Sequence, residues 1–114
     1  MAATWDDFER LQLAVGRIVA VEDLPVTRKP FFALTIDFGP GGTRRSAAQI
    51  THYPRDELIG RQVVAVLGFE PKRVAGFTSE VLVLGAMSEE KDVVLLRARR
   101  RGRGRDACRV GDGV

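Results

Sequence analysis

Residues 69–85, FEPKRVAGFTSEVLVLG, hold the side chains best suited to bind a nucleic acid. Two adjacent cations, Lys72 and Arg73, lie between two aromatic residues, Phe69 and Phe77. In proteins that bind single-stranded nucleic acids, cations contact phosphates while aromatic rings stack on bases. An ordinary turn between two core strands, with its cations in solvent, has the same composition. The residues alone leave both interpretations open.

Basic and acidic residues are segregated along the chain. The basic pairs are Arg28–Lys29, Arg44–Arg45 and Lys72–Arg73, and the acidic pairs are Asp6–Asp7, Glu22–Asp23, Asp56–Glu57 and Glu89–Glu90. The formal net charge of +3 comes from the C-terminus, because residues 97–109 hold seven arginines and one aspartate. Residues 1–96 hold 11 Lys and Arg against 13 Asp and Glu. A basic surface on residues 1–96 must therefore come from segregation of charge rather than from its total.

The apolar pattern predicts short strands joined by turns. Strands are expected at residues 13–21, 31–38, 43–50, 61–69 and 80–84, with one more short apolar run at 92–96. Glycines and a proline at 39–42 predict a hairpin turn, and Gly16 predicts a bend or bulge in the first strand. Short helices are expected at 4–11, with Thr4 as N-cap, and at 54–59, with Pro54 at its start. This pattern favours a partly open barrel.

The inventory of reactive side chains argues against an enzyme. One histidine, His52, and one cysteine, Cys108, cannot form a usual zinc site, and no phosphate-binding glycine motif is present. We therefore expect no catalytic residue, cofactor or metal. His52 is expected in a loop, where contact with a base or phosphate remains open. The chain has no apolar run long enough to span a bilayer and no secretory signal, so a cytoplasmic protein is expected.

Four segments carry a resemblance to a known family: LTIDFG at 34–39, SAAQIT at 46–51, LIGRQV at 58–63, and the stretch 69–85. Over residues 5–96 the chain resembles the CsaA-type tRNA-binding domain family, which also occurs appended to methionyl-tRNA synthetases. The resemblance implies an all-β fold, a five-stranded barrel of the oligonucleotide-binding (OB) type with short helical insertions. It also implies tRNA as partner and a homodimer. The stand-alone CsaA branch is associated with a chaperone role in protein export.

On this hypothesis the chain binds RNA through a basic face of the barrel, without chemistry. The expected phosphate contacts are Arg28, Lys29, Arg44, Arg45, Lys72 and Arg73. Phe69 and Phe77 are expected to stack on bases or support the loop, although phenylalanines are more often core residues. Hydrogen bonds to bases and sugars are expected from Ser46, Gln49, Thr51 and Ser79. Glu80 would accept hydrogen bonds from base edges or orient Arg73 or Arg45.

The C-terminus departs from the family pattern. We expect a tRNA-binding domain at residues 1–96 and a basic tail at 97–114, with no strand or helix from about Arg99 onward, because dense like charge opposes folding. The tail is either a basic arm that adds phosphate contacts or an aberrant end whose arginines have no role. The expected dimer contacts are Trp5, Val93 and Leu95.

A second hypothesis is a chaperone that holds unfolded preproteins for export through apolar surface of the dimer. A third is a structural assembly domain that binds neither partner. Salt dependence separates the first two hypotheses. Phosphate contacts weaken steeply with salt, whereas apolar contacts do not.

Overall fold

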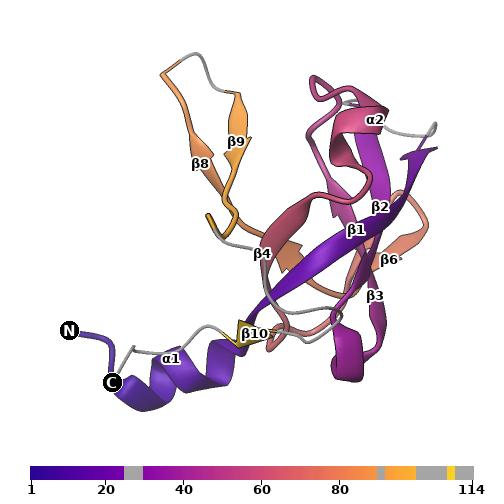
Figure 1. Ribbon diagram of the computed structural model, residues 1–114. Coiled ribbons are helices and arrows are strands. Elements are labelled where there is room, and N and C mark those ends of the chain that lie inside the picture. The colour runs from indigo at the N-terminus through magenta and orange to yellow at the C-terminus, as the bar shows by residue number, and fades with distance from the viewer. Residues whose placement is uncertain (25–29, 90–91, 100–107, 110–114) are drawn as a thin grey trace.

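The sheet is built around one long strand, β1 (Leu13–Leu24) (Figure 1). The structure, a computed structural model, describes residues 1–24, 30–89, 92–99 and 108–109. The C-terminal part of β1 pairs with β2 (Phe31–Asp37), and its N-terminal part pairs with β4 (Gln62–Val66). A register shift between Ile18 and Ala20 lies close to the point where one partner gives way to the other. Such a bulge increases local twist and lets one strand serve two sides of a curled sheet.

The remaining strands complete a strongly curled half-barrel. The strand β3 (Thr43–Ala48) pairs with β2, and β7 (Leu82–Val83) pairs with β4. The order along the sheet is β3-β2-β1-β4-β7, with every pair antiparallel. The short 3-10 turn η1 (Gly39–Gly41) joins β2 to β3, as expected of a hairpin connection. The all-β, OB-type fold is therefore confirmed.

Alternating side chains of the strands fill the inside of the half-barrel. Ile18, Leu34 and Ile36 are fully buried there, together with Phe38 just after β2. The helix α2 (Arg55–Leu58) adds Leu58 to this core, and its bounds lie within the expected 54–59. Gly16 is required for packing rather than for a bend. A Cβ at this position would lie 2.6 Å from Ile36 Cγ2, too close for two carbon atoms.

Two hairpins extend the barrel. The first is β5 (Lys72–Val74) with β6 (Phe77–Ser79), and the second is β8 (Gly85–Met87) with β9 (Val93–Leu95). The β8–β9 hairpin projects from the barrel (Figure 1). The loop before α2 holds β9 in place. His52 Nε2 lies 2.9 Å from the Val93 carbonyl oxygen, and the Tyr53 hydroxyl accepts a hydrogen bond from the Leu95 N–H (3.1 Å).

The N-terminal helix α1 (Trp5–Leu11) has the cap expected from its sequence. The Thr4 hydroxyl accepts a hydrogen bond from the Asp7 N–H, and the Asp7 carboxylate accepts one from the Thr4 N–H. The second of these bonds is the main cause of the lowered pKa of the Asp7 carboxyl group. Among the described residues, no helix is both long and apolar enough to cross a membrane.

Several strand bounds differ from the sequence prediction, among them those of β4, β5 and β7. The strand expected at 61–69 ends at Val66, because the next two N–H groups, of Leu67 and Gly68, donate to the carbonyls of Gln12 and Leu11. The strand expected at 80–84 is limited to Leu82–Val83, because the Glu80 N–H donates to Arg45 at the end of the sheet. Residues 72–74, expected in a loop, form β5.

The expectation that no residue from about Arg99 onward forms a strand is wrong at two positions. The strand β10 (Cys108–Arg109) pairs with Ala14 and Val15 of β1. This edge of β1 lies beyond its last pairing with β2, so its backbone groups are open to another strand. Main-chain hydrogen bonds do not depend on side-chain charge, so the arginine content of the tail does not prevent this pairing. Residues 100–107 and 110–114 lie outside the described residues.

Candidate nucleic-acid interface

The β5–β6 hairpin presents the Lys72–Arg73 pair to solvent. Its turn consists of Ala75 and Gly76, with φ of 51° and 83°. Positive φ at both central residues is characteristic of the tight turn whose twist matches that of its flanking strands. Arg73 lies opposite Thr78 in the register, and its guanidinium donates to the Thr78 hydroxyl (2.8 Å). Both cations are exposed, so the hairpin holds them at defined positions on its surface.

The neighbouring strand β3 contributes Arg45. Its guanidinium lies over the Phe77 ring, 4.5 Å from the ring centroid, and 3.7 Å from a Glu22 carboxylate oxygen. The Arg45 and Glu22 side chains are both well exposed, so this ion pair is weak and can exchange for another anion. Stacking on Phe77 orients the guanidinium plane. Arg45 and Phe77 thus join β3 to the hairpin. Because side chains alternate along a strand, Lys72 lies on the same face of the hairpin as Phe77, and Arg73 with Thr78 lies on the other face.

The serines and Glu80 predicted to contact RNA join β3 to the chain after β6. The Ser79 hydroxyl accepts a hydrogen bond from the Ala47 N–H (3.0 Å) and donates to the Val81 carbonyl (3.2 Å). The Ser46 hydroxyl, which is 1% exposed, donates to the same carbonyl (3.0 Å). The Glu80 carboxylate accepts from the Arg45 N–H (3.1 Å). These hydrogen bonds close the barrel and hold Arg45 in place, and contact of the same residues with RNA stays a prediction.

The other predicted contacts are spread more widely. Arg44 is half-buried on β3, on the opposite face from Arg45 because side chains alternate along a strand. Gln49 is exposed and Thr51 half-buried in the segment after β3, and Phe69 is exposed between β4 and β5. The structure therefore places these residues in segments other than the β5–β6 hairpin. Arg28 and Lys29 lie outside the described residues.

The three predicted dimer residues have different environments. Trp5 is 69% exposed on α1. Leu95 is buried in the core of its own chain at 5% exposure, and Val93 is half-buried against that core. Leu95 is therefore a core residue in this chain. The exposed residue of β9 is Val94, which lies opposite Ala86, whereas the exposed Met87 of β8 lies opposite Val93; neither Val94 nor Met87 was singled out individually from the sequence.

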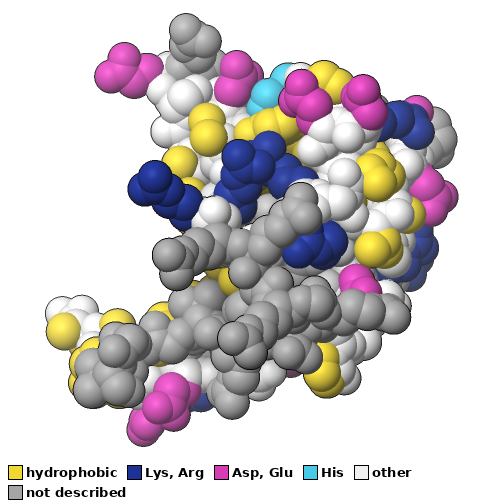
Figure 2. All heavy atoms as spheres, viewed as in Figure 1, with side chains coloured by type: hydrophobic (Ala, Val, Ile, Leu, Met, Phe, Trp, Pro, Cys, Tyr) yellow, Lys and Arg dark blue, Asp and Glu magenta, His cyan; other side chains and the backbone are white. Residues whose placement is uncertain are grey.

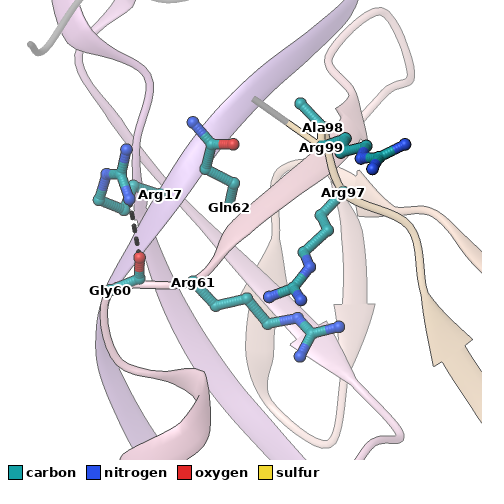
Figure 3. A pocket seen from close by; sticks show the side chains of 7 residues that line it. All are labelled: Arg17, Gly60, Arg61, Gln62, Arg97, Ala98 and Arg99. Carbon is teal, nitrogen blue, oxygen red and sulfur yellow. Dashed lines mark hydrogen bonds between the residues drawn. The ribbon is translucent and has the colours of Figure 1, made fainter. Parts of the chain in front are cut away.

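The structure also contains a basic pocket that the sequence did not predict. It has a volume of about 440 Å³ and lies where the start of β4 meets the segment after β9 (Figure 3). Its lining residues are Arg17, Gly60, Arg61, Gln62, Arg97, Ala98 and Arg99. They come from segments about 40 residues apart, so no spacing rule could have grouped them. Figure 2 shows Lys and Arg side chains gathered between the β8–β9 hairpin and the barrel.

Comparison with known proteins gives consistent results over most of the chain. Residues 13–103 match the family described as "Putative tRNA binding domain". The structure superimposes on the chaperone CsaA from Bacillus anthracis with a TM-score of 0.87 and 44% identity, covering 97% of this chain and 100% of that one. It superimposes on CsaA from Picrophilus torridus with a TM-score of 0.86 and 40% identity, covering 96% and 100%.

A longer class of relatives contains the same domain. The chain is 33% identical to methionine–tRNA ligase of Pyrococcus abyssi over 96 residues. The match covers 84% of this chain but 13% of the ligase, so the chain spans a small part of that enzyme.

Proposed function

This chain belongs to the tRNA-binding domain family, and on that premise we propose that it binds tRNA without catalysis, through the surface formed by β3 and the β5–β6 hairpin. The observation that carries the proposal is the stack of Arg45 on Phe77, on a hairpin that carries the exposed Lys72 on the same face and the exposed Arg73 on the other. A planar cation held on an aromatic ring, with two further cations on a rigid hairpin, suits unpaired bases and the phosphates that join them.

The supporting hydrogen bonds give this surface a fixed geometry. The Arg45 backbone bonds Glu80 in both directions, through the Glu80 N–H (2.7 Å) and the Glu80 carboxylate. Arg73 is held by Thr78. A binding group that is already ordered loses less conformational entropy when its ligand arrives. The surface is therefore suited to recognise the shape of a structured RNA.

The first test is the salt dependence of tRNA affinity for the full chain and for Lys72→Ala/Arg73→Ala. If both cations contact phosphates, the variant binds more weakly and the slope of log affinity against log salt falls by roughly 1.4–1.8. The full chain is retained because β10 pairs with β1, and truncation would remove a strand.

Arg10→Ala is the control, since it removes one exposed cation from α1, away from the hairpin. Unchanged affinity and slope in the Lys72→Ala/Arg73→Ala variant would exclude this surface as the site. Binding of an unfolded polypeptide that is insensitive to salt would then favour the chaperone hypothesis, in which unfolded preproteins are the partners. The specific observation that supports this second candidate is the exposure of three large apolar side chains, Trp5, Met87 and Val94.

We also propose that the chain forms a homodimer, with Trp5 on α1 and the β8–β9 hairpin as contact regions. Trp5 at 69% and Met87 at 67% exposure are costly to leave in water. Sedimentation velocity at micromolar protein is expected to give a dimer, and Trp5→Ala is expected to shift it toward monomer. A monomer at all concentrations, with or without Trp5, would contradict the proposal.

A further inference from the structure

The basic pocket has a construction that the proposed RNA surface does not explain. Its walls carry four arginines, Arg17, Arg61, Arg97 and Arg99 (Figure 3). None of the residues that line it is an aspartate or a glutamate. It is built from β1, β4 and the segment after β9, whereas the proposed RNA surface is built from β3, β5 and β6. The pocket is therefore a separate concentration of positive charge.

Backbone pairing fixes the floor of the pocket. The register of β1 and β4 sets Arg17 opposite Gln62. The Arg17 guanidinium donates to the Gly60 carbonyl (2.9 Å), and the Gly60 N–H donates to the Ile18 carbonyl (2.8 Å). In the other direction, the Ile18 N–H donates to the Arg61 carbonyl (3.0 Å). These two hydrogen bonds to Ile18 fix the backbone of Gly60 and Arg61 against β1.

Arg61 has a buried donor without an acceptor. Its Nε is buried, and among the described residues no hydrogen-bond partner for it is found. Its guanidinium lies over the Tyr53 ring, 5.1 Å from the centroid, which restrains the plane of the group. Buried polar groups in native proteins are almost always paired, because an unmade hydrogen bond is costly. A guanidinium that is oriented by the Tyr53 ring, with an N–H that has no acceptor among the described residues, is a candidate donor to a ligand in the pocket.

The arginine from the tail points into the same space. In Figure 3 the Arg97 side chain extends from the segment after β9 toward the guanidinium of Arg61. Neither Arg61 nor Arg97 forms an ion pair with a described residue; the ion pairs found there involve Arg10, Arg45 and Arg55. Two positive charges that face one cavity repel each other. An anion bound between them attracts both and offsets this repulsion.

We propose that this pocket binds a phosphate ester, with Arg61 and Arg97 as its principal ligands and Gln62 as an additional donor. Guanidinium groups match phosphate oxygens with paired N–H bonds, and the pocket volume lies in the range of small-molecule sites. The phosphate belongs either to a nucleotide of bound tRNA, an assignment that rests on the proposed function, or to a free nucleotide. On this proposal, arginines after β9 bind phosphate, and this part of the C-terminal tail has a function.

The first arm of the test uses a free nucleotide. Nitrogen-15 spectra of the full chain are recorded during titration with cytidine 5′-monophosphate, and separately with cytidine, at constant ionic strength. We expect saturable shifts at Arg61, Gln62 and Ala98 with the monophosphate and none with cytidine. Arg61→Gln and Arg97→Gln should abolish them, whereas Arg10→Gln should retain them. Arg97 is exposed, so its variant tests the pocket even if the Arg61 variant is poorly folded.

The second arm uses tRNA. If Arg61 and Arg97 each contact one phosphate, Arg61→Gln or Arg97→Gln should lower the salt slope of tRNA affinity by about 0.7–0.9, with no change in Arg10→Gln. A change in both arms, or in the tRNA arm alone, assigns the phosphate to RNA. A response to the monophosphate alone assigns the pocket to a free nucleotide. If the wild-type protein also fails to bind tRNA, the proposed tRNA-binding function is wrong, but the phosphate site in the pocket is still supported. No response in either arm overturns the proposal.

Discussion

Replacing Arg45 by alanine is expected to weaken tRNA binding about 5- to 150-fold, the largest effect of any single cation on β3 and the β5–β6 hairpin. Arg45 supplies a charge and also a planar group stacked on Phe77, 4.5 Å from the ring centroid. Removal of one base-stacking group costs about 1–3 kcal/mol, and about 1.4 kcal/mol corresponds to tenfold in affinity. Lys72 and Arg73 are expected to contribute charge alone.

The measurement is tRNA affinity against salt for Arg45→Ala beside Arg45→Lys. The lysine variant keeps the charge but loses the planar group, so it should preserve the salt slope while recovering only part of the affinity. Removal of the competing carboxylate in Glu22→Gln should leave binding unchanged or strengthen it, because the ion pair at 3.7 Å competes with phosphate. Wild-type affinity in Arg45→Ala would show that RNA is bound elsewhere.

Strand positions were predictable wherever one face of the strand is buried. β2 was located to within one residue of its observed bounds, because residues 31–34 are apolar and residues 34–38 alternate between apolar and polar. β1 was predicted too short. Its last residues, Glu22 and Asp23, are polar and exposed, yet they pair with Ala33 and Phe32 at the end of the barrel. Pairing with β2 keeps these residues in the strand. The polarity pattern of β1 by itself contains no information about how far β2 extends beside it.

The site was predictable in its residue types but not in its arrangement. The cations and aromatics of 69–85 were evident, but the stack of Arg45 on Phe77 joins residues 32 positions apart. On the tRNA-binding hypothesis, Ser46 and Ser79 were predicted to form hydrogen bonds to bases and sugars. Sequence does not show that their hydroxyls already have partners. The basic pocket was missed for a related reason: it depends on the register that sets Arg17 beside Gln62.

Loss of both serine hydroxyls at the closure between β3 and β7 is expected to destabilise the fold by more than the sum of the two single changes. Ser46 and Ser79 donate to one acceptor, the carbonyl of the buried Val81. In Ser46→Ala the carbonyl keeps its bond from Ser79, so a loss of about 0.5–1.5 kcal/mol is expected. In Ser79→Ala the Ala47 N–H loses its acceptor, so about 1–3 kcal/mol is expected.

In the double variant the Val81 carbonyl loses both donors in a buried position. Groups that share a partner typically show coupling energies of about 0.5–3 kcal/mol, which should appear here as extra destabilisation in a double-mutant cycle measured by urea unfolding. Ser88→Ala is the matched control, because that hydroxyl accepts a bond from the exposed Asp92 N–H on the outer hairpin and its loss should cost little. Additive effects would contradict a shared acceptor. If instead the serine variants keep their stability but lose tRNA affinity, the two hydroxyls serve RNA binding rather than closure of the barrel.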